Sequence, residues 1–249
     1  MLSDNTLFGI KDKVKIAIER LRKYEELTEG EGYYLAFSGG KDSCVIKALA
    51  DMAGVKYDAH YSVTGIDPPE VVYFIREHHS GVKFEMPDKT FLQLLPTVGF
   101  PTRRIRWCCR LLKEKGGEGR VVVTGLRKSE GARRSRRKLL EGDTIKQYVN
   151  PIIDWSDRDV WEFIRKNNIP YCKLYDEGWH RIGCLFCPMA HNERFIHYER
   201  YPKMAEAFRW AFRRLYSNRK AKPKPDGSTS VDRWKDGDDM FDWWIRGKK

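Results

Sequence analysis

Short apolar runs alternate with helix-like patterns through the first half of this chain. Four runs have the character of strands: "YYLAF" at 33–37, "KYDAHYSV" at 56–63, "VKFEM" at 82–86 and "RVVVTG" at 120–125. Helical patterns follow the first three runs, at 44–52, 69–78 and 91–95. Such alternation is typical of repeated βαβ units, whose parallel strands form a sheet covered by helices on both faces. We therefore predict an α/β fold with a doubly wound, mostly parallel sheet.

Helical segments are expected on either side of this α/β region. Ile10, Val14, Ile18 and Leu21 recur at a spacing of three to four, which predicts an amphipathic helix over 7–27. Ser156 and Asp159 form a capping box that predicts the start of a helix used for packing. We divide the chain into an N-terminal helix (1–30), a nucleotide-binding domain (31–190) and a C-terminal extension (191–249) that is helical, aromatic and basic.

The C-terminal extension ends in an aromatic tail. After one or two amphipathic helices, a linker-like stretch leads to Trp234, Trp243 and Trp244. These side chains are too apolar to stay wholly in water, so we expect the tail to fold back or to meet a partner.

Composition narrows the class of protein. The 249 residues are 41% hydrophobic, enough for a substantial core, and contain no run of eighteen apolar residues. The N-terminus lacks the pattern of a secretory signal, so we expect a soluble, cytoplasmic protein with no membrane partner. In that compartment six cysteines are thiols or metal ligands rather than disulfides.

The net charge of +12 is concentrated at "TRRIRWCCR" and "RKSEGARRSRRK". Basic clusters of this kind suit a nucleotide phosphate, a sulfate ester or a nucleic-acid backbone, although a merely solvated surface is the ordinary alternative.

The sequence "SGGKDS" at 38–43 stands at the first turn from strand to helix, the usual phosphate site of open α/β sheets. Gly39 and Gly40 allow close backbone approach, and the helix start supplies free N–H groups and a positive dipole end. Ser38, Lys41 and Ser43 add side-chain donors. The ordinary P-loop is excluded, because Lys41 is followed by Asp42 and not by Ser or Thr.

Four of the six cysteines form two pairs, Cys108–Cys109 and Cys184–Cys187. Four thiolates are the ligand set of zinc or of an iron–sulfur cluster, and adjacent cysteines are less common around zinc. Cys44 and Cys172 are expected to pack in the core, with a reactive Cys172 as the less favoured alternative.

Several motifs together resemble a known family. "SGGKDS" after an apolar strand is similar to the PP-loop of the adenine-nucleotide α-hydrolase superfamily. The blocks "CCR" at 108–110, "VVTGLRKSEGARRSRR" at 122–137, "PIIDWSDRDVWEFIRKNNIPY" at 151–171 and "IGCLFCP" at 182–188 resemble, in order, those of the phosphoadenosine/adenosine phosphosulfate reductase family. The resemblance spans roughly residues 30–190 and implies a PP-loop fold for that region.

The resemblance also implies a nucleotide site. ATP or an adenylyl sulfate, with Mg²⁺, would bind the loop Ser38–Ser43, where Lys41, Asp42 and Ser43 would be catalytic. The family's second strand ends in a Thr-Gly turn, and its "TGxR" block faces the nucleotide. A pair of arginines beyond that block, Arg133 and Arg134 or Arg136 and Arg137, would grip the anionic group. The additional candidates are Thr64, Gly65, Thr124, Gly125, Arg127, Arg133, Arg134, Arg136 and Arg137.

The CC…CxxC pattern is similar to that of the reductases that hold a 4Fe-4S cluster, which assigns a cluster to Cys108, Cys109, Cys184 and Cys187. Zinc remains the alternative.

The same family reduces its substrate through a cysteine near its C-terminus, and this chain has none after Cys187. We therefore expect an ATP pyrophosphatase or sulfur-transfer enzyme that acts in nucleic-acid or small-molecule sulfuration, with a nucleic acid or a sulfur-donor protein as partner. Two alternatives stay open. One is a sulfonucleotide reductase that uses a non-standard or partner cysteine, and the other is a non-catalytic nucleotide or redox sensor. A homodimer is compatible with each of them.

Overall fold

The computed structural model describes residues 2–6, 9–142, 145–190 and 193–246. By its internal contacts the chain forms two compact units. The sheet unit contains Met1–Ser62, Pro69–Glu85 and Lys115–Ile182, and the helical unit contains Val63–Pro68, Met86–Glu114 and Gly183–Lys249. The linear boundaries at 30 and 190 stay a prediction.

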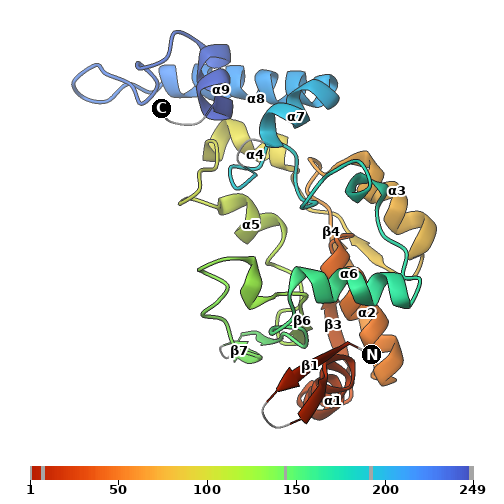
Figure 1. Ribbon diagram of the computed structural model, residues 1–249. Coiled ribbons are helices and arrows are strands. Elements are labelled where there is room, and N and C mark those ends of the chain that lie inside the picture. Colours follow the sequence, from red (N-terminus) through yellow and green to blue (C-terminus); the bar gives the residue numbers. More distant parts are fainter. Residues whose placement is uncertain (1, 7–8, 143–144, 191–192, 247–249) are drawn as a thin grey trace. The chain divides into compact units, whose positions relative to one another are not determined.

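A six-stranded sheet forms the centre of the sheet unit (Figure 1). Its strand order is β5-β4-β3-β6-β8-β7. Neighbouring strands are parallel except for β7 and β8, which pair antiparallel. The mostly parallel α/β sheet predicted from the sequence is therefore confirmed. The strands are β3 (Tyr33–Ala36), β4 (Tyr57–Ser62), β5 (Lys83–Glu85), β6 (Val121–Val123), β7 (Leu140–Gly142) and β8 (Gln147–Val149).

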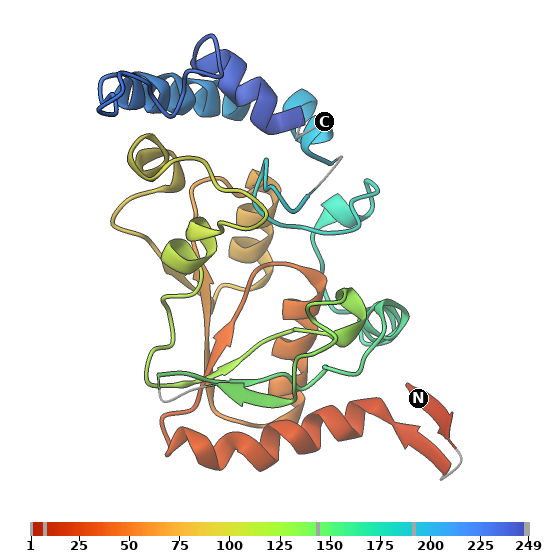
Figure 2. The same ribbon diagram turned by 90° about the vertical axis from the view of Figure 1, so that its left-hand side faces the viewer.

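Helices flank this sheet. The α2 helix follows β3 directly, and α1 packs against α2, as Figure 2 shows for the long helix near the N-terminus. Ser156 caps α6 with the predicted capping box. The helices of the sheet unit are α1 (Lys13–Glu25), α2 (Lys41–Ala53), α3 (Pro69–His78) and α6 (Asp157–Lys166), with the 3-10 turns η1 (Glu26–Thr28), η2 (Lys128–Glu130) and η3 (Lys173–Tyr175).

The predicted helix over 7–27 is wrong at its N-terminal end. The strands β1 (Ser3–Thr6) and β2 (Gly9–Asp12) pair antiparallel there, and residues 7 and 8 lie outside the described residues. The helix begins at Lys13 because the Asp12 side chain accepts hydrogen bonds from the backbone N–H groups of Val14 and Lys15.

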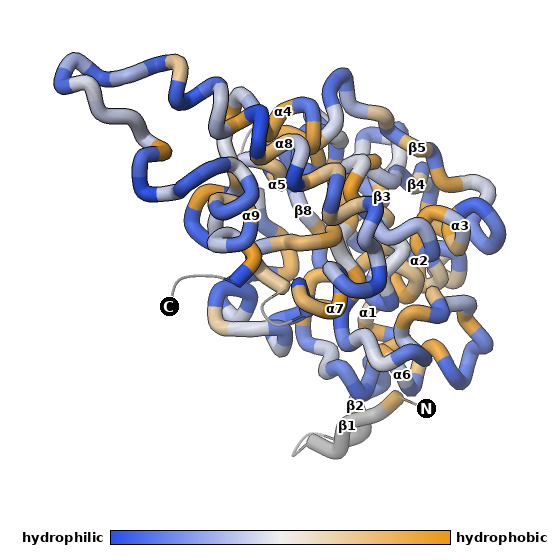
Figure 3. The backbone as a smooth tube through the Cα atoms, turned by 90° about the horizontal axis from the view of Figure 1, so that it is seen from above, coloured by the Kyte–Doolittle hydropathy of each residue, from blue (hydrophilic) through white to orange (hydrophobic). Residues whose placement is uncertain are grey.

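The helical unit is built around aromatic side chains. The C-terminal α9 packs against α8, and Trp234 and Trp244 are buried, so the prediction that the aromatic tail folds back is confirmed. Figure 3 shows the connection between α8 and α9 as largely hydrophilic, as its composition predicts. The helices are α4 (Phe91–Val98), α5 (Trp107–Leu112), α7 (Glu193–Arg200), α8 (Pro202–Lys220) and α9 (Gly237–Arg246). None of the helices in the described residues has the length and apolar character needed to span a bilayer.

We expect acid to destabilise the sheet unit through His79, which is buried between Phe37 and Phe74. Burial, and then the charge of Lys47, lowers the pKa of His79 from 6.5 to about 4. The unfolded chain therefore binds this proton at a higher pH than the folded protein does. The stability contributed by neutral His79 is present above pH 6.5 and is lost as the pH falls toward about 4.

Urea unfolding of the wild type and of His79→Phe at several pH values measures this effect. The wild type should lose about 2 kcal/mol more than the variant between neutral pH and roughly pH 5. Equal losses in the two proteins would show that His79 does not cause the acid sensitivity.

Candidate nucleotide and metal sites

The loop 38–43 connects β3 to α2 and has the backbone form of an anion site. Gly39 has φ +72°, and a Cβ there would lie 2.7 Å from Val71 of α3, so conformation and space both require glycine. Gly40 is the N-cap of α2 and supplies no side chain to cap it. The helix start therefore keeps the polar character that favours a phosphate.

Side chains within the loop fix its shape. The Ser43 hydroxyl donates to the Gly40 carbonyl oxygen at 2.7 Å, and the Ser38 and Ser43 hydroxyls are 3.3 Å apart. Ser38 is exposed, whereas Lys41 and Ser43 are buried. The structure thus brings together all of the serines and glycines that the sequence singled out in this loop.

Lys41 contacts a segment far away in the sequence. Its ammonium lies 3.1 Å from an Asp157 carboxylate oxygen and 3.3 Å from the His180 carbonyl oxygen. The rings of Tyr175 and Trp161 lie within 5.3 Å and 5.9 Å of the same ammonium. The Lys41 backbone N–H donates to the Tyr175 hydroxyl at 2.9 Å. None of these four partners was identified from the sequence.

Arg127 is the predicted arginine that reaches the loop. It is buried, and its Nε donates to Asp42 at 2.6 Å while Nη2 donates to Asp157 at 3.1 Å. Gly125, from the same "TGxR" block, lies so close that a Cβ would be 2.9 Å from the Asp42 backbone. Because β6 and β3 are parallel neighbours, the segment after β6 meets the loop at the carboxyl edge of the sheet. Thr124 of this block instead bonds to Asn150.

Two of the remaining arginine candidates pair with glutamates, and the other two are exposed. Arg134 pairs with Glu130, and Arg137 pairs with Glu141. Arg133 and Arg136 are exposed. Their proposed contact with an anion stays a prediction.

Thr64 and Gly65 belong to the helical unit, as do the four paired cysteines. The Thr64 hydroxyl donates to Asp67 at 2.6 Å, and the Cys184 thiol lies 3.8 Å from the Thr64 oxygen. The Thr-Gly turn is thus in contact with a cysteine segment, a relationship that the sequence did not indicate.

Cys108 and Cys109 lie in the first turn of α5 and share a hydrogen bond. That bond, followed by burial and the charges of Cys184 and Cys187, raises the pKa of Cys108. The same bond, with the Arg106 guanidinium 3.2 Å from its sulfur, lowers the pKa of Cys109 to about 5. The charges of the Cys184–Cys187 segment thus act on the pKa of Cys108.

Cations accompany these thiols. Burial raises the pKa of Cys184 to about 11, although the nearby Lys113 ammonium opposes the shift. Lys113 also lies 3.8 Å from Asp67. Within the described residues, no three or more His, Cys, Asp or Glu side chains are arranged to hold a metal ion. The donor set is right in kind for a cluster, with soft thiols beside compensating cations, and the assignment stays a prediction.

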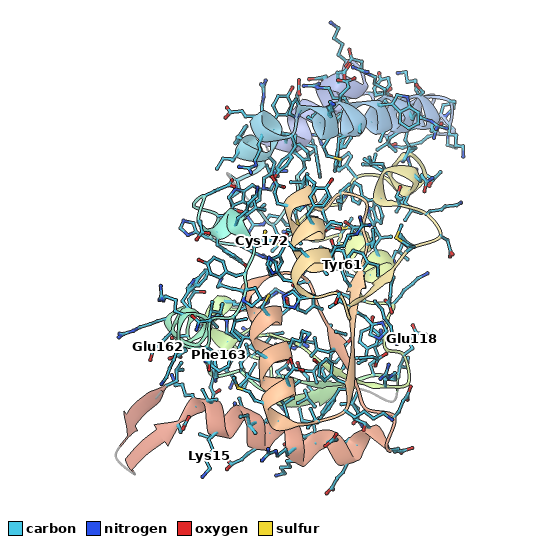
Figure 4. The ribbon with its side chains drawn as sticks, turned by 90° about the vertical axis from the view of Figure 1, so that its right-hand side faces the viewer. Lys15, Tyr61, Glu118, Glu162, Phe163 and Cys172 are labelled. Carbon is cyan, nitrogen blue, oxygen red and sulfur yellow. The ribbon has the colours of Figure 1, made fainter. Side chains whose placement is uncertain are left out.

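The other two cysteines are core residues. Cys44 and Cys172 are fully buried, and burial raises the pKa of both thiols. Figure 4 shows Cys172 within the interior. The expectation that both pack is confirmed.

A strand, a glycine-rich loop and a helix at the carboxyl edge of a mostly parallel sheet define a PP-loop α/β protein. Residues 32–190 match the phosphoadenosine phosphosulfate reductase domain. The match covers more than half of the chain, which therefore belongs to this family.

Individual relatives agree with this placement. An uncharacterised protein of Methanocaldococcus jannaschii is 32% identical over 218 residues, which are 78% of this chain and 52% of the relative. The adenosine 5'-phosphosulfate reductase of Allochromatium vinosum is 32% identical over 146 residues, 51% of this chain and 56% of the relative. The chain thus spans about half the length of these curated relatives.

Among solved structures, the phosphoadenylyl-sulfate reductase of Candida auris is similar with a TM-score of 0.53 and 19% identity, covering 68% of this chain and 87% of that one. At this identity the likeness establishes the fold.

Proposed function

We propose that this chain binds ATP or an adenylyl sulfate, with Mg²⁺, on the loop 38–43 and holds a 4Fe-4S cluster on its four paired cysteines. The observation that carries the nucleotide site is the loop itself. It combines a left-handed Gly39, a helix start without a side-chain cap and the buried Lys41, and the buried Arg127 reaches it from the segment after β6. Three features that each favour an anion meet at one point.

The reaction class that suits this site is cleavage at the α-phosphate with release of pyrophosphate. Lys41, Arg127 and the N–H groups of α2 would stabilise charge on the phosphates, and Asp42 would be positioned by its bond to Arg127. A cluster bound at Cys108, Cys109, Cys184 and Cys187 would supply a soft metal site for sulfur chemistry. An oxygen of the acceptor would take the AMP group as pyrophosphate leaves, and sulfide from a sulfur donor would then replace that oxygen, which leaves with AMP.

We favour sulfur transfer over reduction because neither thiol of the sheet unit is suited to attack the sulfur of an adenylyl sulfate. Reduction of an adenylyl sulfate needs a thiolate that attacks sulfur. The sheet unit offers only Cys44 and Cys172 for this role, and both are buried with raised pKa values. The exposed Arg133 and Arg136 would suit a nucleic-acid acceptor.

A sulfonucleotide reductase is the second candidate, because relatives of this chain carry that name. The attacking thiol would then come from another segment or from a partner chain. Pyrophosphate release from ATP, measured beside thioredoxin-dependent sulfite release from adenosine phosphosulfate, separates the two reactions. Sulfur transfer predicts the first signal, which should depend on an acceptor, whereas reduction predicts the second.

We expect Lys41→Ala to weaken ATP binding by about 10- to 100-fold, the loss typical of one hydrogen bond to a charged group. Ser43→Ala should cost about five-fold, because it removes a neutral bond within the loop. Calorimetry measures both affinities. Lys47→Ala is the control, since Lys47 is on the same helix and pairs with Asp51. Wild-type affinity in all three variants would move the nucleotide away from the loop.

A further inference from the structure

One carboxylate joins the two cations of the candidate phosphate site. Asp157 Oδ1 lies 3.1 Å from Lys41 Nζ and 3.1 Å from Arg127 Nη2. Asp157 stands at the first position of α6, and its side chain is 61% exposed, whereas those of Lys41 and Arg127 are 7% and 3% exposed. A mostly solvated carboxylate thus bridges two buried cations.

The other donors of the loop are engaged by the same part of the chain. The Tyr175 hydroxyl accepts the first N–H of α2, and the His180 carbonyl oxygen accepts from the Lys41 ammonium. Residues 157–180 therefore bond to the Lys41 backbone N–H, to the Lys41 ammonium and to Arg127, three groups that a phosphate would otherwise use. An oxygen that bridges a lysine and an arginine is also how a phosphate oxygen binds such a pair.

The charges at this point are already balanced. Lys41 and Arg127 bring two positive charges, and Asp42 and Asp157 bring two negative ones. If a phosphate entered while both carboxylates stayed, negative charge would exceed positive charge at this point. The balance is kept only if one carboxylate leaves as the phosphate binds both cations. Asp42 is the more firmly held, since it bonds to Arg127 at 2.6 Å and its side chain is 24% exposed. Asp157 is held at the longer distance of 3.1 Å, and its side chain is more exposed.

We propose that the Asp157 carboxylate occupies the place of a nucleotide phosphate and is displaced when the nucleotide binds. This inference rests on the proposed nucleotide site. In the ligand-free protein, Asp157 keeps Lys41 and Arg127 in position and neutralised. The ligand must compete with it, so a ligand with several phosphate charges is favoured over a singly charged anion. Asp157 is thus a determinant of affinity and charge specificity, with no part in the chemical step.

Asp157→Asn tests this, because it removes the charge and keeps the shape. Calorimetric titration with ATP and with inorganic pyrophosphate, both with Mg²⁺, compares the variant with the wild type. We expect both ligands to bind roughly five- to ten-fold more tightly to the variant, since the competing charge is gone. Glu162→Gln is the matched control. It removes one carboxylate from the same helix, labelled in Figure 4, and should leave both affinities unchanged.

Each outcome is decisive. If Asp157→Asn binds ATP and pyrophosphate as the wild type does, or more weakly, Asp157 is not a competitor, and weaker binding would make it a partner of the ligand or its Mg²⁺. If Glu162→Gln tightens binding equally, the effect is one of overall charge and the inference is wrong. A wild type that binds neither ligand overturns the proposed nucleotide site itself, and the inference with it. Equal thermal unfolding midpoints would show that the variants are folded.

Discussion

Protein purified without oxygen is expected to be brown and to contain about four iron atoms per chain, because four thiolates typically hold one cubane cluster. The four paired cysteines lie in one unit, and the other three contribute to the raised pKa of Cys108. Loss of any one ligand leaves an incomplete set. The single variants Cys108→Ser, Cys109→Ser, Cys184→Ser and Cys187→Ser should therefore each lose most of the iron and the visible absorbance.

Cys44→Ser and Cys172→Ser are the controls for this experiment. Both replace a buried cysteine of the sheet unit, so they should keep the iron even if they lower stability. Iron and zinc are measured together by mass spectrometry, and absorbance gives the cluster type. A colourless protein with one zinc per chain would favour the zinc alternative, and a protein with neither metal would leave the cysteines without a metal role.

The sheet could be predicted because its signals are local. Apolar runs such as 33–37 are followed within a few residues by helical spacing, and the runs that became β4 and β5 have the same character. The strands β7 and β8 were missed because their sequences, LEG and QYV, contain no apolar run. At the N-terminus, Ile10 continues the spacing of the following helix, but it belongs to β2. Asp12 starts the helix after it, and apolar spacing alone does not reveal this.

In the candidate sites, too, the residues that are contiguous in the sequence could be predicted, and their distant partners could not. The loop 38–43 is contiguous, so its residue types alone indicate a phosphate. Its partners Asp157 and Tyr175 lie more than a hundred residues further on, and only the folded chain brings them to Lys41. A capping-box helix start at 156 did predict α6, yet nothing in that pattern shows that its first residue faces two cations. The partners of the cysteines, Asp67 and Lys113, were missed for the same reason.

Arg127→Met is expected to lower both the stability of the protein and its affinity for ATP, because Arg127 bonds to Asp42 and to Asp157. A buried guanidinium that is lost leaves the Asp42 carboxylate without its 2.6 Å partner, which typically costs about 3–5 kcal/mol of stability. The same change removes a two-pronged donor from the phosphate site. We expect ATP affinity to fall by about 100-fold or more. Arg127→Lys should recover little, since an ammonium cannot reproduce the fork that reaches both carboxylates.

A double variant separates the two effects. In Arg127→Met with Asp42→Asn, the unpaired carboxylate is neutralised, so much of the lost stability should return, whereas the lost donor to phosphate is not replaced. Urea unfolding and the calorimetric affinity for ATP are therefore both measured on the wild type, on Arg127→Met and on the double variant. If Arg127 is only structural, stability and ATP affinity will recover together. If it also binds phosphate, as we expect, stability will recover while ATP affinity stays low.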